Sequence, residues 1–106
     1  MATYISVEGE PEVVRIQLSL GGAEKFRIYQ HEGYLYVKIL QRATGGLKPH
    51  TEEAFGVLFV VRDSYDFNLT ALEELHDLQL QKESISTVTD FGKGLLEIQI
   101  PFTRGA

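Results

Sequence analysis

Residues 94–101 read GLLEIQIP: a glycine, a strand that alternates between apolar and polar residues, and a proline. The apolar side chains Leu96, Ile98 and Ile100 recur at every second position. A period of two is typical of a β-strand with one buried face, because successive side chains point to opposite sides. We therefore predict a closing strand over residues 95–102, with the proline as its stop.

The same alternation extends through much of the chain. We expect further strands at residues 13–20, 26–30, 34–40, 55–62 and 85–89, and a hairpin made by 26–30 and 34–40 around a turn at 31–33. Segment 55–62 is apolar on both faces, which predicts a strand that is covered on both sides. The polar stretch RDSYDFN at 62–68 then predicts a strand exit with local turns, and residues 41–53, with two glycines and a proline, predict a long loop.

One short helix is expected at residues 70–81. Thr70 is placed to cap it, Glu73 completes a capping box, and Leu72, Leu75 and His76 follow at helical spacing. About seven short strands and one helix before the penultimate strand indicate an all-β fold. The expected architecture is an immunoglobulin-like, two-sheet antiparallel β-sandwich that forms one domain over residues 1–106.

Composition limits the partners. The chain of 106 residues is 43% hydrophobic and has no cysteine, so disulfides and thiolate metal sites are ruled out. It shows neither a signal peptide nor an apolar run of the roughly 20 residues that a membrane span needs, and we expect a soluble, cytoplasmic protein without a membrane partner. Ten basic residues scattered along a chain of net charge −5 oppose nucleic-acid binding, and we expect no nucleic-acid partner.

No constellation of catalytic residues is visible. His31, His50 and His76 do not stand at metal-ligand spacing, and nothing brings a histidine to Ser64 as a hydrolase would need. The GGLKPH stretch at 45–50 lacks the phosphate-loop pattern and is interpreted as a flexible connection. We expect no metal, no cofactor and no enzyme activity.

Two tyrosines suggest a surface. Tyr34 and Tyr36 alternate with Leu35 and Val37 and so lie on the less buried face of their strand. They either pack under a loop or form an interaction surface, since aromatic residues are enriched in binding patches.

The order of these motifs resembles the α-crystallin domain of the small heat-shock proteins. GLLEIQIP at 94–101 fits every position of the family's C-terminal motif, and Ile85-Ser86-Thr87 is similar to the triplet on its preceding strand. VVRIQL at 13–18 and FRIYQHEGYLYVKI at 26–39 resemble an earlier strand and hairpin of the family. The resemblance covers about residues 12–102.

The resemblance implies an ATP-independent chaperone, a holdase of the stress response that binds exposed apolar segments of unfolding client proteins. By the same resemblance, a client- or peptide-binding groove is bounded by Phe26, Ile28, Ile85 and Val88, where an extended segment adds by β-augmentation. The same four side chains are equally compatible with simple core positions. The family's assembly tail would begin where this sequence ends, so we expect a monomer or a homodimer.

A second interpretation uses the same sandwich differently. The protein is then a non-enzymatic adaptor or structural subunit, co-chaperone-like or part of an assembly, with one specific protein partner. An unrecognised enzyme is a third possibility that no residue constellation supports.

Overall fold

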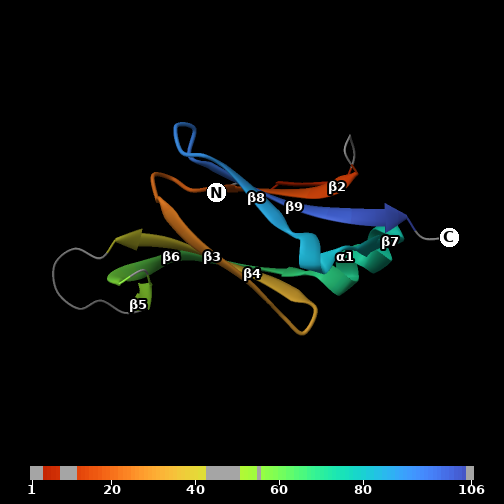
Figure 1. Cartoon of the computed structure of the whole chain (residues 1–106), viewed down its shortest axis with the longest axis horizontal. Helices are drawn as coiled ribbons and strands as arrows, with labels where there is room; N and C mark the ends of the chain where they lie inside the picture. The colour runs from red at the N-terminus through yellow and green to blue at the C-terminus, as the bar shows by residue number, and fades with distance from the viewer. Residues whose placement is uncertain (1–3, 8–11, 43–50, 55, 105–106) are drawn as a thin grey trace. The chain divides into compact units, whose positions relative to one another are not determined.

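Most of the described residues belong to β-strands (Figure 1). The structure, a computed structural model, describes residues 4–7, 12–42, 51–54 and 56–104, and within these ranges it contains nine strands, one α-helix and one short 3-10 helix. Two antiparallel sheets and a helix before the last strands confirm the expected all-β fold class, and this set of elements is consistent with a β-sandwich. The chain divides into two compact units, residues 1–22 with 69–106 (unit 1) and residues 23–68 (unit 2). The single domain expected over residues 1–106 stays a prediction.

Unit 1 is organised around the closing strand. Strand β9 (Leu95–Arg104) pairs on one side with β2 (Val13–Ser19), which in turn pairs with β1 (Tyr4–Ser6). On its other side β9 pairs first with β8 (Ser86–Asp90) and then, near its end, with β7 (Leu78–Leu80). All of these pairings are antiparallel. Strands from the N-terminal and C-terminal parts of the chain thus lie in one sheet.

The alternating pattern of GLLEIQIP places its apolar face in the core, as expected. Leu96, Ile98 and Ile100 are fully buried and stand opposite the equally buried Leu18, Ile16 and Val14 of β2. Each such side chain contributes about 1.5–3 kcal/mol when it leaves water, so this double row is a main source of stability in unit 1.

The proline does not stop the strand, which corrects the expectation. β9 runs on through Pro101 to Arg104. The Pro101 carbonyl accepts a hydrogen bond from the Gln81 backbone N–H at 2.8 Å, while the neighbouring Phe102 N–H points the other way, to the Glu12 carbonyl. Proline lacks an N–H, and here the missing donor faces the junction where β8 ends its pairing and β7 begins. The sheet therefore loses little backbone hydrogen bonding at Pro101.

The helix is shorter than predicted. α1 spans Leu69–His76, so Thr70 lies inside its first turn rather than at its cap. Asp77 adopts a positive φ of 52° and turns the chain into β7, where Leu78 and Leu80 are buried and Gln79 between them is exposed. Residues 78–80 therefore form a strand, although we expected them to be helical. Their alternation covers only three residues and is too short to be recognised in the sequence. A 3-10 turn, η1 (Lys82–Ser84), follows.

Glu73 has a different task from the expected capping box. Its carboxylate accepts a hydrogen bond from the Leu80 backbone N–H at 2.9 Å and lies 3.5 Å from the Lys82 ammonium. One side chain of α1 is thereby bonded to β7 and to η1. The capping box was the wrong assignment because these neighbours in space compete for the carboxylate.

Unit 2 is a four-stranded antiparallel sheet. The strands follow the order β3 (Lys25–His31), β4 (Tyr34–Arg42), β6 (Val57–Asn68) and β5 (Thr51–Ala54). The expected hairpin is confirmed as β3 and β4, joined by Glu32 and Gly33. Both turn residues have positive φ, 48° and 82°, as the two-residue turn that matches strand twist requires.

Strand β6 departs most from expectation. It continues to Asn68, so RDSYDFN is strand rather than a turning exit, and residues 63–68 pair in register with β4. It is not covered on both sides either, since Leu58 is 39% exposed. A register shift at Ile39/Leu40 leaves Arg62 as the extra residue of a bulge, and its guanidinium bonds the neighbouring Asp63 carboxylate at 2.7 Å. Strand β5 occupies part of the expected loop, whose residues 43–50 lie outside the described residues together with Phe55.

Candidate functional site

Two of the predicted groove residues lie on an edge strand of unit 2. Phe26 and Ile28 share one face of β3, opposite Ile39 and Val37 of β4, and both are half-buried. Among the strands that the structure describes, β3 pairs with β4 alone. Within the described residues, no strand pairs with its other edge.

The other two lie at an edge of unit 1. Ile85 precedes β8 and is half-buried, while Val88 within β8 is 53% exposed. β8 likewise pairs with β9 alone in the described part of the chain. The four residues thus mark edge strands of two separate sheets. A groove shared by the two pairs stays a prediction.

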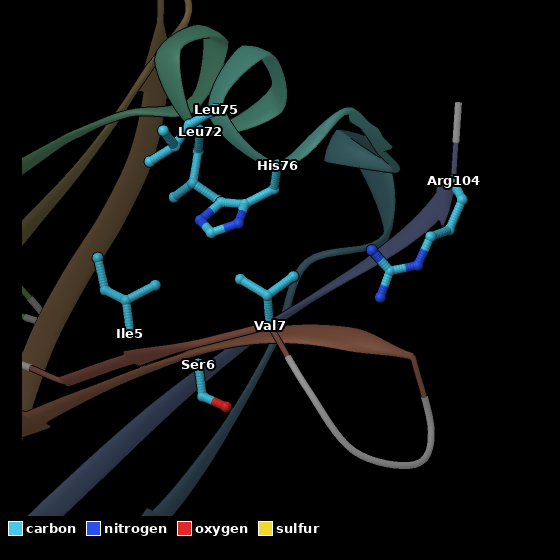
Figure 2. Close-up of a pocket in the computed structure, with 7 residues that line it drawn as sticks. All are labelled: Ile5, Ser6, Val7, Leu72, Leu75, His76 and Arg104. Atoms are coloured by element: carbon cyan, nitrogen blue, oxygen red, sulfur yellow. The ribbon is translucent and has the colours of Figure 1, made fainter. Parts of the chain in front are cut away.

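A cleft in unit 1 was not expected from the sequence. It has a volume of about 570 Å³ and lies between α1 and β1, and we call it the α1–β1 cleft. Figure 2 shows Leu72, Leu75 and His76 pointing from the helix toward Ile5 and Val7, with Arg104 reaching in from the end of β9. Ser6 completes the lining.

The cleft presents apolar side chains to solvent. Leu75 is 79% exposed and Ile5 is 40% exposed, whereas Leu69 on the same helix is completely buried. Exposed leucine and isoleucine side chains that face one another across a cleft can accept apolar groups of a partner.

One cationic side chain, Arg104, borders this apolar surface. The Arg104 guanidinium is 3.7 Å from the Glu12 carboxylate and lies 5.2 Å from the centre of the Phe102 ring. Arg104 is thereby held beside the apolar lining, to which His76 also belongs. The spacing of Leu72, Leu75 and His76 predicts that they share one face of a helix. The cleft itself could not be predicted, because β1, which forms its other side, has only three residues and shows no clear alternation.

A smaller depression surrounds Val88. It has a volume of about 170 Å³, and its lining includes Val88, Leu95 and Glu97. Hydrogen bonds from the side-chain amides of Gln17 (2.8 Å) and Gln99 (2.6 Å) hold the pKa of the Glu97 carboxyl below its ordinary value. The depression therefore carries a fixed negative charge beside exposed apolar side chains.

Tyr34 and Tyr36 are half-exposed on unit 2, and their role as an interaction surface stays a prediction. The rings of Tyr34 and Tyr36 stack with centroids 6.0 Å apart, and Tyr29 of β3, which was not predicted, stacks on Tyr36 at 5.1 Å. Tyr34 also accepts a hydrogen bond from the Asn68 side-chain amide at 3.3 Å. The cross-strand register reveals Tyr29 as a partner, since it pairs directly with Tyr36.

The described residues contain no group of three or more His, Asp or Glu side chains placed to hold a metal ion, and no polar side chain among them is buried. None of the described helices has the length and apolar character needed to cross a membrane. His31 and His76 lie on separate units, and His50 falls outside the described residues.

Comparison with known proteins adds no relative. No family model, curated protein or solved structure matches this chain. The resemblance to the α-crystallin domain therefore stays a prediction, and the functional argument rests on the surfaces described above.

Proposed function

We propose that this protein binds exposed apolar segments of other proteins without ATP, in the manner of a small heat-shock holdase. The observation that carries the proposal is the α1–β1 cleft, with Leu75 79% exposed in its lining. An unfolding client offers the matching chemistry, since its core side chains are briefly in contact with water.

The cleft is suited to weak and reversible capture. Each client side chain that it covers gains about 1.5–3 kcal/mol by leaving water. Immobilising a flexible segment costs several kcal/mol, so two or three such contacts give loose binding that needs no energy source for release. In the part of the chain that the structure describes, β1 is also an end strand of its sheet, where an extended segment can hydrogen-bond to the backbone.

The proposal places the protein in the cytoplasm. A chain without cysteine is suited to a reducing compartment, where disulfides do not form. Unfolding clients are the proposed partners, and we propose a monomer or a homodimer as the working form.

Light scattering tests the holdase proposal. A test enzyme is heated without ATP, with and without a molar excess of the protein, and scattering is followed over time. We expect suppression by the natural protein, a weaker effect from Leu75→Gln, and full activity from Leu58→Gln, a matched change of an exposed leucine on unit 2. Unchanged scattering at excess would contradict the proposal.

A second candidate function is that of an adaptor with one protein partner. Val88, Phe91 and Leu95 are 53%, 53% and 43% exposed around the turn that joins β8 and β9. Three exposed apolar side chains beside the acidic Asp90 and Glu97 are typical of a patch that one partner covers. Affinity capture that returns one stoichiometric partner, lost in Val88→Lys but retained in Leu75→Gln, would favour the adaptor over the holdase.

A further inference from the structure

Strand β8 is the least protected sheet edge in the described part of the chain. The other edges there are β1 and β7 in unit 1, and β3 and β5 in unit 2. β1 and β7 have only three residues each, while β3 and β5 carry charged side chains such as Arg27 and Glu53. Shortness and charge are common means of keeping an edge from pairing with another chain. β8 has five residues and is charged only at the last one, Asp90.

β8 is also regular and exposed. Its sequence, STVTD at 86–90, keeps an unbroken register with β9 and contains no proline or glycine. Four of its five residues are exposed, and Val88 at the centre is 53% exposed. Threonine and valine are good strand formers. The edge therefore offers an added strand both backbone groups and an apolar contact.

The sequence of β8 is complementary to itself in the antiparallel direction. A two-fold axis at Val88 makes the following pairs between two copies: Val88 with Val88, Thr87 with Thr89, Ser86 with Asp90, and Ile85 with Phe91. Because cross-strand partners lie on the same face, a symmetric pairing must be centred on a residue. An axis at Thr89 would place Val88 opposite the charged Asp90, and an axis at Thr87 would place it opposite Ser86. Only the axis at Val88 pairs like with like in the middle of the strand.

Each pair in this register is chemically matched. The Ser86 hydroxyl of one copy can donate to the Asp90 carboxylate of the other, which has room for it beside the Lys93 N–H that it accepts at 3.1 Å. At each end, Phe91, which is 53% exposed, comes level with the half-buried Ile85. Aromatic and β-branched side chains stabilise adjacent strands when they face each other. The pairing thus covers apolar groups that are exposed in the single chain.

The net charge of −5 does not oppose this pairing. In the proposed register the two Asp90 carboxylates are four residues apart along the strands, which is about 14 Å. Glu97 stands opposite Val88 on β9, so the two Glu97 side chains are three strand spacings apart, again about 14 Å. Both separations exceed the screening length of about 8 Å at physiological salt. Like charges are therefore kept apart.

We propose that two copies of this chain form a homodimer by antiparallel pairing of β8 with β8 about Val88. The two unit 1 sheets then continue into one another. A single pair of short strands is a small interface, so we expect a weak dimer whose population rises with concentration. The inference specifies the homodimer named above but does not depend on holdase activity, because it uses none of the residues of the α1–β1 cleft.

Sedimentation equilibrium from about 1 μM to about 1 mM tests the pairing. We expect the natural protein to pass from monomer to dimer over this range. Val88→Lys should weaken the dimer at least about tenfold, because two cations would face each other at the axis. This variant should remain folded, since its neighbour on β9 is the acidic Glu97, and circular dichroism checks this. Leu75→Gln, which alters the cleft, is the matched control and should retain the dimer, so the two proposals fail separately.

A disulfide reports the register, because the natural chain has no cysteine. In Val88→Cys the two Cα atoms at the axis would be about 4.5–5.5 Å apart. This lies within the range of about 4.4–6.8 Å that a disulfide spans. Ser86→Cys, at an exposed position on the same face of β8, would place the two Cα atoms about 14 Å apart and is the matched control. On mild oxidation we expect a covalent dimer from Val88→Cys and little from Ser86→Cys.

Three results would overturn the inference. One is a natural protein that remains monomeric up to about 1 mM. Another is a dimer that a folded Val88→Lys leaves at full strength, which would place the interface elsewhere. The third is equally fast cross-linking of Ser86→Cys and Val88→Cys, which would indicate random collisions rather than a fixed register.

Discussion

Two leucines of the same helix should respond in opposite ways to substitution. Leu75 of α1 is 79% exposed, while Leu69 is completely buried. Burying a whole leucine contributes about 1.5–3 kcal/mol, so the fifth of Leu75 that is covered contributes about 0.3–0.6 kcal/mol. Glutamine has nearly the helix propensity of leucine, so Leu75→Gln should change the free energy of unfolding by less than about 0.7 kcal/mol.

Leu69→Ala has a far larger expected effect. Removing a fully buried leucine side chain costs about 2–5 kcal/mol, through lost burial and the cavity that remains. Urea unfolding followed by circular dichroism measures both variants, and the midpoint of Leu69→Ala should fall by about 1 M or more at an unchanged slope.

For client binding the order should be reversed: Leu75→Gln should lower the affinity more than Leu69→Ala does. If Leu75 contacts clients, its replacement removes about 1–2 kcal/mol of binding, which is about a 5- to 30-fold loss of affinity. Titration with a permanently unfolded client gives the affinity at a temperature where both variants remain folded. A loss of more than about 1.5 kcal/mol of stability in Leu75→Gln would refute the reasoning, because the side chain would then be part of the packing. Unchanged client affinity would remove the cleft from the proposed function.

Three further predictions concern the turns and one carboxylate. Glu32→Asn should raise the free energy of unfolding by about 0.5–1 kcal/mol in a urea titration, because asparagine tolerates the positive φ of 48° better and the exposed His31 contact at 3.7 Å adds little. Gly94→Ala should cost about 1 kcal/mol for its φ of 68° although the new Cβ meets nothing closer than 3.6 Å, whereas Gly92→Ala in the same turn should be nearly neutral by thermal unfolding. The lowered pKa of Glu97 means that its contribution to stability is present above its ordinary pKa of 4.5 and is lost as pH falls through the lower folded value. The stability difference between the natural protein and Glu97→Gln should therefore shrink on acidification below pH 4.5, and a difference that grows instead would contradict the assignment.

Local pattern alone was enough for the strands with a buried face. In β2, β4 and β9 the side chains expected inside, such as Ile16, Val37 and Ile98, are fully buried. The reason is that a period of two, sustained over six or more residues, has one solution that removes the apolar side chains from water. The hairpin turn followed from its glycine for the same kind of local reason, since the chain there needs positive φ.

The structure at β7, Pro101 and Glu73 was decided by pairing between segments that are distant in the sequence. Leu78 and Leu80 became a strand because the end of β9 was available to pair with them, and Pro101 was tolerated because its missing donor faces a junction between two partners. Glu73 accepts a hydrogen bond from the Leu80 backbone N–H instead of capping the helix, because folding brings Leu80 next to it.

The surfaces show the same division between sequence and tertiary structure. The sequence by itself determined the all-β class, the buried faces and the presence of Tyr34 and Tyr36 on an outer face. Only the tertiary structure placed β1 opposite α1 to form the cleft, and Tyr29 against Tyr36 to complete the stack. The physical reason is that burial follows a local periodicity, whereas a binding surface is made by side chains that register and topology bring together from separate parts of the chain.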